Sequence, residues 1–135
     1  MGFDWPPYAY VPTRNARHPK GAFDGLIASV GPDVPTAALH HTAAFRAGMA
    51  YLKAGYYWEA HEVFEPIWMA APPGSAERLV AQILIQIANA RLKHAMQRPK
   101  AAARIEQIVR DLLVLCPAAG ALGLTRAALG GLAET

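Results

Sequence analysis

One short stretch of this chain combines the side-chain types that acid–base and metal chemistry require. It contains Glu59, His61, Glu62 and Glu65, and its three glutamates are half of the six in the sequence. On a helix, His61 and Glu65 lie four positions apart and therefore project from one face. An imidazole beside a carboxylate can transfer a proton, and the two groups can also ligate a metal ion. His61 and Glu65 are therefore the candidate catalytic residues and the candidate metal ligands.

The metal interpretation leaves alternatives open. The metalloprotease helix reads His-Glu-x-x-His, whereas this chain has Glu65 in place of the second histidine. Metal sites in helical bundles draw donors from several helices, and the further donors here are His94, His40 and His41. The sequence requires no cofactor, and a divalent metal ion is the alternative. A hydrogen-bonded pair of His61 and Glu65 that only holds helices in register explains the same pattern.

Amides in the most apolar segment form a second polar group. Residues 76–97 are apolar on nearly every side, which is typical of a central, buried helix. Gln86 and Asn89 interrupt this segment, and buried amides require hydrogen-bond partners. We expect those partners on the preceding helix, at 57–70, or on the N-terminal segment. The sequence therefore predicts a polar pocket between these two helices.

The N-terminal segment, residues 1–35, is predicted to be an extended arm. It holds six of the 11 prolines together with five aromatic residues, so it cannot form a long helix. We expect its rings to lie on the helical domain. Arg17 and His18 would then fold back onto the glutamate cluster, where an Arg–carboxylate fork would seal the polar site. An arm that remains exposed is the alternative.

The fold class predicted for the whole chain is all-α. No segment alternates apolar and polar residues as a strand does. We expect a bundle of three to four main helices within residues 36–117, and a tail at 118–135 with at most a short, frayed helix at 125–129. The main helices are expected to begin at 36 or 42 and end at 54, and then to span 57–70, 76–97 and 99–117, with a kink or local break at Pro66.

Length and composition limit the functional classes. A chain of 135 residues, 53% hydrophobic and 17% charged, fits one folded domain and excludes a disordered chain. Its single cysteine, Cys116, excludes a disulfide framework and is expected to be an inert core thiol. The net charge of +3 does not indicate nucleic-acid binding. Because no leader peptide or membrane span is evident, we expect a cytoplasmic protein without membrane partners; a homo-oligomer stays open.

Three motifs resemble the domain of unknown function 309 family. They are Tyr10-x-Pro12 with Arg17-His18-Pro19, the run from Gly55 to Trp68 with its Ala-His-Glu-x-x-Glu-x-x-Trp core, and Gln82-Ile83-Leu84-Ile85-Gln86-x-Ala88 with His94 downstream. The resemblance implies a small helical bundle of bacteria and archaea without an established activity. It also implies that these residues gather in one place: Arg17, His18, His61, Glu62, Glu65, Trp68 and Gln86.

These observations favour a module that binds a small ligand or a protein partner in a polar pocket. One alternative is a hydrolase-type enzyme that uses His61 and Glu65, with or without a metal ion. The other alternative is a polar cluster that is purely structural. The candidate ligand-binding residues are Arg17, His18, His61, Glu62, Glu65, Trp68, Gln86 and His94.

Overall fold

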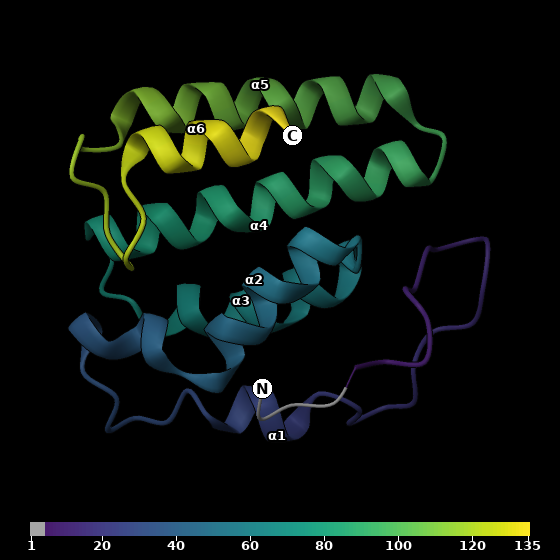
Figure 1. Ribbon diagram of the computed structural model, residues 1–135, viewed down its shortest axis with the longest axis horizontal. Helices are drawn as coiled ribbons and strands as arrows, with labels where there is room; N and C mark the ends of the chain where they lie inside the picture. Colours follow the sequence, from purple (N-terminus) through teal and green to yellow (C-terminus); the bar gives the residue numbers. More distant parts are fainter. Residues whose placement is uncertain (1–4) are drawn as a thin grey trace.

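The computed structural model describes residues 5–135, and residues 1–4 of the predicted arm lie outside this range. Within it the regular structure consists of helices, without a strand, so the all-α prediction is confirmed (Figure 1). The elements are α1 (Asp24–Ala28), the 3-10 helix η1 (Thr36–His41), α2 (Ala43–Ala54), α3 (Tyr57–Ala70), α4 (Ala76–Ala95), α5 (Pro99–Leu115) and α6 (Arg126–Glu134).

Helix α4 is the centre of the molecule. It packs against α3 on one side and against α5 on the other, while α2 covers α3 (Figure 1). This double contact explains why α4 is apolar on nearly every side. Its fully buried residues face both neighbours, and they are Val80, Ala81, Ile83, Leu84 and Ala88. The sequence prediction of a buried central helix is therefore confirmed.

Helices α2 and α3 approach closely because a glycine lies at their contact. Gly48 of α2 lies directly against the phenyl ring of Phe64 from α3, and a Cβ atom at Gly48 would lie 2.5 Å from Cε1 of that ring. Phe45 packs edge-on against the same ring, with 5.8 Å between the ring centroids. This contact fixes the position of α3, which carries the glutamate cluster.

The helix boundaries follow local chemistry, and α6 departs from the prediction. Gly55 ends α2 with a φ of 90°, the left-handed conformation that glycine adopts without strain. Helix α2 begins directly after Thr42, the later of the two expected starts, because Thr42 is extended and caps it; residues 36–41 form the separate 3-10 helix η1. Helix α6 continues to Glu134, well past the short helix predicted for the tail. Arg91 holds it there by donating to the carbonyl oxygen of Leu132 and to the hydroxyl of Thr135.

The Thr42→Ala substitution should measurably destabilise the protein. The buried Thr42 hydroxyl accepts from the amide of Phe45 at 3.2 Å and donates to the carbonyl oxygen of Leu39 at 2.8 Å. Loss of a helix N-cap costs typically about 1 kcal/mol, and up to about 2 when the site is favourable. Urea denaturation should show a loss in this range for Thr42→Ala. The exposed cap of α6 provides the comparison, and Thr125→Ala should cost less; an equal or larger loss would contradict the explanation.

Pro66 does not interrupt α3, which runs as one helix from Tyr57 to Ala70. The predicted local break is therefore wrong. Val63, Phe64 and Ile67 are completely buried on both sides of the proline, so core packing holds the helix through this position. Within residues 5–135, no helix combines the length and the apolar character that crossing a membrane would require.

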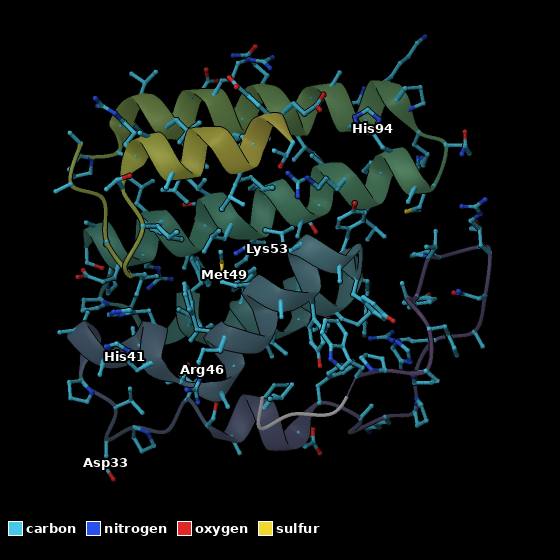
Figure 2. All side chains as sticks on the ribbon, viewed as in Figure 1. Asp33, His41, Arg46, Met49, Lys53 and His94 are labelled. Atoms are coloured by element: carbon cyan, nitrogen blue, oxygen red, sulfur yellow. The ribbon has the colours of Figure 1, made fainter. Side chains whose placement is uncertain are left out.

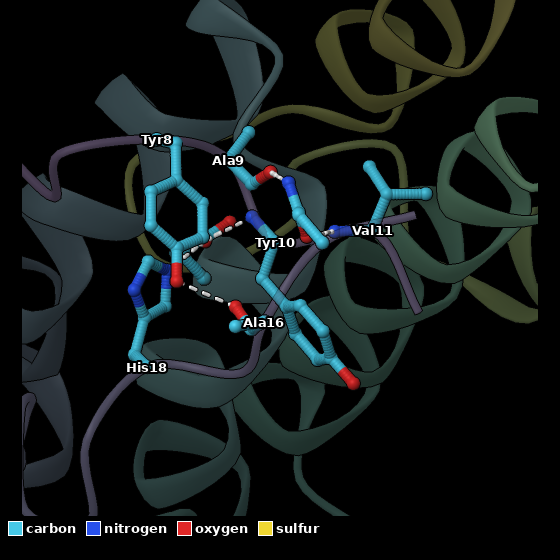
Figure 3. Close-up of polar contacts among 8 residues, drawn as sticks. Tyr8, Ala9, Tyr10, Val11, Ala16 and His18 are labelled. Atoms are coloured by element: carbon cyan, nitrogen blue, oxygen red, sulfur yellow. Dashed lines mark hydrogen bonds and ion pairs between the residues drawn. The ribbon is translucent and has the colours of Figure 1, made fainter. Parts of the chain in front are cut away.

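The part of the arm from residue 5 to residue 23 is irregular, and α1 follows it directly. Trp5 packs on Tyr51 and Tyr56, with centroid distances of 5.4 and 5.3 Å, and Tyr10 packs edge-on against Trp58 at 5.1 Å. The arm also stabilises itself, since the hydroxyl of Tyr8 donates to the carbonyl oxygen of Ala16 at 2.6 Å (Figure 3). This segment runs along α3, where it meets the first turn of that helix.

Candidate functional site at the arm and helix α3

A buried histidine–glutamate pair joins the arm to α3. Nε2 of His18 lies 2.6 Å from Oε2 of Glu59, and the two side chains are only 3% and 0% exposed. The backbone amide of Tyr10 donates to the same Oε2 at 2.7 Å. Glu59 belongs to the first turn of α3, where the helix dipole favours a negative charge. It lies on the buried stripe with Val63 and Ile67, four and eight positions later, which explains its burial.

Aromatic side chains surround the imidazole of His18. Tyr8 stacks on it with 4.9 Å between the ring centroids (Figure 3), while Phe23 and Trp58 lie at 5.6 and 6.0 Å. This shell fixes the plane of the ring and excludes most of the solvent. Nε2 of His18 is taken by Glu59, and Nδ1 forms no hydrogen bond within residues 5–135, while Oε1 of Glu59 is a buried oxygen without a hydrogen-bond partner there.

The arm and α3 enclose a cavity of about 430 Å³, hereafter the arm cavity. Its lining combines a loop of the arm with one side of α3, and it comprises residues 17–24, Ile27, Trp58 and Glu62. His18 also lines a second, more apolar cavity of about 540 Å³ beside Pro6 and Leu26. Two cationic and two anionic side chains line the arm cavity: Arg17, Lys20, Asp24 and Glu62.

Arg17 does not form the predicted fork with a carboxylate. Of the ion pairs that the described chain contains, none includes Arg17. Its guanidinium lies instead over the indole ring of Trp58, 5.4 Å from the centroid. Trp58 offers the guanidinium a flat π face beside the cavity, which is the contact that Arg17 makes instead.

The candidate catalytic pair of the sequence lies on a different, more exposed side of α3. Nε2 of His61 is 3.4 Å from Oε2 of Glu65, and Nδ1 is 3.5 Å from Oε1 of Glu62. Ligand atoms of all three side chains lie within 4.8 Å of one another. Glu62 connects this group, the His61 cluster, to the arm cavity, because it lines that cavity as well.

The remaining candidates do not join these residues. Trp68 lies under the guanidinium of Arg78, at 4.0 Å, and lines a cavity of about 560 Å³ between the end of α3 and the start of α4. That lining includes neither the His61 cluster nor Gln86. Gln86 is half-buried and forms no side-chain hydrogen bond within residues 5–135, so its expected partners on α3 or the arm are wrong.

His94 belongs to another part of the molecule. It pairs with Glu106 of α5, with 3.2 Å between Nε2 and Oε2, and lines a cavity of about 410 Å³ bounded by α4, α5 and α6. Figure 2 shows His41 and His94 at opposite ends of the structure. Within residues 5–135 the one group of three potential metal ligands is the His61 cluster, so His94, His40 and His41 do not supply the expected further donors.

The single thiol, Cys116, has the surroundings of an unreactive core residue. It is buried, and Sγ donates weakly to the carbonyl oxygen of Pro117 at 3.4 Å. Burial raises the pKa of the thiol, and the positive charge of Arg126 only partly opposes this. The thiolate is therefore disfavoured at neutral pH, in agreement with the inert role expected from the sequence.

A family model described as "Domain of unknown function (DUF309)" matches residues 45–105, which include α3, α4 and the His61 cluster. Over residues 45–105 the chain is similar to the DUF309 family. No curated protein and no solved structure matches the chain. The matched DUF309 segment contains Glu59 but not its partner His18, which lies in the arm before the match begins.

Sequence reasoning missed the role of Glu59. It treated this residue as one member of a glutamate cluster and assigned the site to its neighbours. A signal was present, because Glu59 occupies the position four residues before Val63 and so falls on the apolar face of α3. A carboxylate on an apolar helix face must be paired, and His18 is the partner that the arm brings.

Proposed function

We propose that this protein binds a small polar molecule of low net charge in the arm cavity. The observation that carries the proposal is His18, a buried histidine that lines the cavity; Glu59 holds its Nε2, and its Nδ1 forms no hydrogen bond to the described residues. A ligand that hydrogen-bonds to Nδ1 would satisfy this nitrogen.

The size and charge of the arm cavity support the same class of ligand. A volume of about 430 Å³ lies within the range of small-molecule sites, which is roughly 300–1,000 Å³. Its two cationic and two anionic side chains balance, so a polyanion such as a nucleic acid is not favoured. Trp58 and Phe23 supply the apolar wall that orients such a ligand.

A fluorinated-fragment screen by ligand-observed NMR, with fragments of low net charge, tests the proposal. The Ala22→Trp substitution places a large ring at the lining of the cavity without changing His18 or Glu59. Ala103→Trp provides the matched control, because Ala103 is equally exposed but lies on α5. We expect fragments that bind the wild type and Ala103→Trp and shift the ring signals of His18, but that fail to bind Ala22→Trp.

Two outcomes of this screen would overturn the proposal. One is a wild-type protein that binds no fragment. The other is binding that survives Ala22→Trp, which would place the ligand elsewhere, for example in the cavity beside His94. In either case a purely structural role for the His18–Glu59 pair would remain.

A metal site at the His61 cluster is the second candidate, and the spacing of its ligand atoms favours it. The ligands of one zinc ion lie roughly 3–3.5 Å apart, because each is about 2 Å from the metal. Here one ligand atom each from His61, Glu62 and Glu65 lie within 4.8 Å of one another, so small side-chain movements would bring all three to one ion. Glu62 would place such an ion at the edge of the arm cavity, which would support the metal-assisted hydrolase that the sequence left open.

Isothermal titration with zinc chloride tests this second candidate. We expect uptake of one ion per chain, lost in His61→Ala and kept in His94→Ala. His94 is the matched control, since it pairs with one carboxylate at 3.2 Å but lacks a third ligand among the described residues. Equal uptake by the two variants, or no uptake by the wild type, would exclude the site.

A further inference from the structure

We propose that His18 and Glu59 form an acid–base dyad, in which Nδ1 of His18 takes a proton from a hydroxyl group or water in the arm cavity. The inference rests on the proposed function, because it needs a molecule in that cavity. It differs from the sequence hypothesis, which placed acid–base chemistry at His61 and Glu65. The geometry favours His18 over His61 on three grounds.

The first ground is the tautomer that the hydrogen bonds impose. Oε2 of Glu59 accepts the backbone N–H of Tyr10, so it acts as an acceptor. With Glu59 ionised, as the dyad requires, Nε2 of His18, 2.6 Å from the same oxygen, is the donor. In the neutral ring this leaves Nδ1 with a lone pair, and Nδ1 forms no hydrogen bond within residues 5–135. A general base needs this state.

The second ground is orientation. A histidine base is most effective when a carboxylate holds its other nitrogen and stabilises the imidazolium that forms. Glu59 meets this requirement, since it is completely buried and fixed by two hydrogen bonds. His61 lies between two carboxylates, at 3.4 and 3.5 Å, so each of its nitrogens faces a negative charge and neither is left for a ligand.

The third ground is the shielding of the ring. Tyr8, Phe23 and Trp58 surround the imidazole of His18, whose side chain is 3% exposed. Electrostatic interactions are stronger where water is excluded, so the charge of Glu59 acts on the ring with little screening. The side chain of His61 is 27% exposed, and that of Glu65 is 50% exposed, so solvent screens this pair.

The dyad can hydrolyse an ester with water as the only co-reactant, without a cofactor. A water molecule beside Nδ1 loses one proton to that nitrogen, and its oxygen bonds to the carbonyl carbon of an ester. The resulting tetrahedral species expels the alcohol part, and the imidazolium returns its proton to that leaving group. Glu59 accepts the Nε2–H bond throughout and is itself a positioning residue. The products are one carboxylic acid and one alcohol.

Long-range proton–nitrogen NMR of the wild-type protein tests the tautomer directly. At mildly alkaline pH we expect the His18 ring to carry its proton on Nε2 and none on Nδ1. Glu59→Gln should keep this tautomer, because the amide oxygen can accept the same bond, so the spectrum also shows whether the variant retains its fold. A ring protonated on Nδ1 in the wild type would overturn the proposal.

Hydrolysis of p-nitrophenyl acetate tests the chemistry. General acid–base catalysis contributes roughly 10²–10⁴-fold, and the cavity is not matched to this ester. We therefore expect His18→Asn to lower the hydrolysis rate above the uncatalysed background roughly 10²-fold. Glu59→Gln should lower the same rate roughly 10-fold while the His18 tautomer is unchanged. His41→Asn removes an exposed histidine outside both sites and should keep the wild-type rate.

The outcomes separate this inference from the proposed function. If fragments bind the arm cavity but His18→Asn hydrolyses the ester as fast as the wild type, the dyad is wrong and the binding site stands. If Glu59→Gln keeps the wild-type rate, the carboxylate does not assist and the dyad is equally wrong. If fragments fail to bind as well, both proposals fall.

Discussion

Replacing Glu59 by alanine should cost more stability than any other single change in the site, about 3–5 kcal/mol of the free energy of unfolding. The substitution removes the acceptor of two buried donors, Nε2 of His18 and the amide of Tyr10, and leaves a void beside Val63. Groups that lose their partner in the interior retain the full cost of desolvation. Urea denaturation followed by circular dichroism measures the loss.

Glu62→Ala provides the control for this prediction, because it is the same substitution three residues along α3. Glu62 is half-buried and lies 3.5 Å from His61, so its removal should change stability by about 0.5 kcal/mol or less. Similar losses in the two variants would show that the His18–Glu59 pair is not the anchor of the arm. The double variant His18→Leu, Glu59→Leu should lose less than Glu59→Ala, because it leaves no unpaired charge.

Gly48→Ala should also destabilise the protein, by about 2 kcal/mol. Overpacking a core costs typically about 1–3 kcal/mol, and the added methyl group would lie 2.5 Å from the ring of Phe64. The better helix propensity of alanine, worth about 0.5–1 kcal/mol, offsets only part of this cost. Thermal unfolding measures the net effect, which should appear as a lower melting temperature.

Gly131→Ala is the matched comparison, since it makes the same change in a helix. No atom lies within 4 Å of a Cβ placed at Gly131 in α6. The propensity gain therefore stands alone, and the variant should be more stable than the wild type by about 0.5–1 kcal/mol. A stabilised Gly48→Ala would mean that α2 and α3 separate easily, contrary to the packing described above.

The helices were predictable because their signals are local. Periodic apolar residues, Gly55 and the cap at Ser75 each act within a few positions, and α3 and α4 begin where expected. The errors came from tertiary effects. Core packing carries α3 through Pro66, and the contact with Arg91 extends α6, although neither influence is visible in a local pattern.

The candidate site was less predictable, because spacing along a helix does not say which side is buried. His61 and Glu65 do lie together, as their four-residue spacing indicates. The pairing of His18 with Glu59 spans 41 residues, and no periodicity encodes it. The resemblance implied that the motif residues gather, but Trp68 lies with Arg78 instead.

The arm has a consequence for the order of folding. Contacts between successive helices join segments that are close in sequence, so they form quickly. These contacts are α2 with α3, α3 with α4, and α4 with α5. The arm is held across longer loops, through His18 to Glu59 and through Arg14 to the carbonyl oxygen of Ala95, 81 residues away. Closing such loops has an entropic cost that only a formed α3 can offset. The helical body is therefore expected to fold first, and the arm to complete the cavity in the last step.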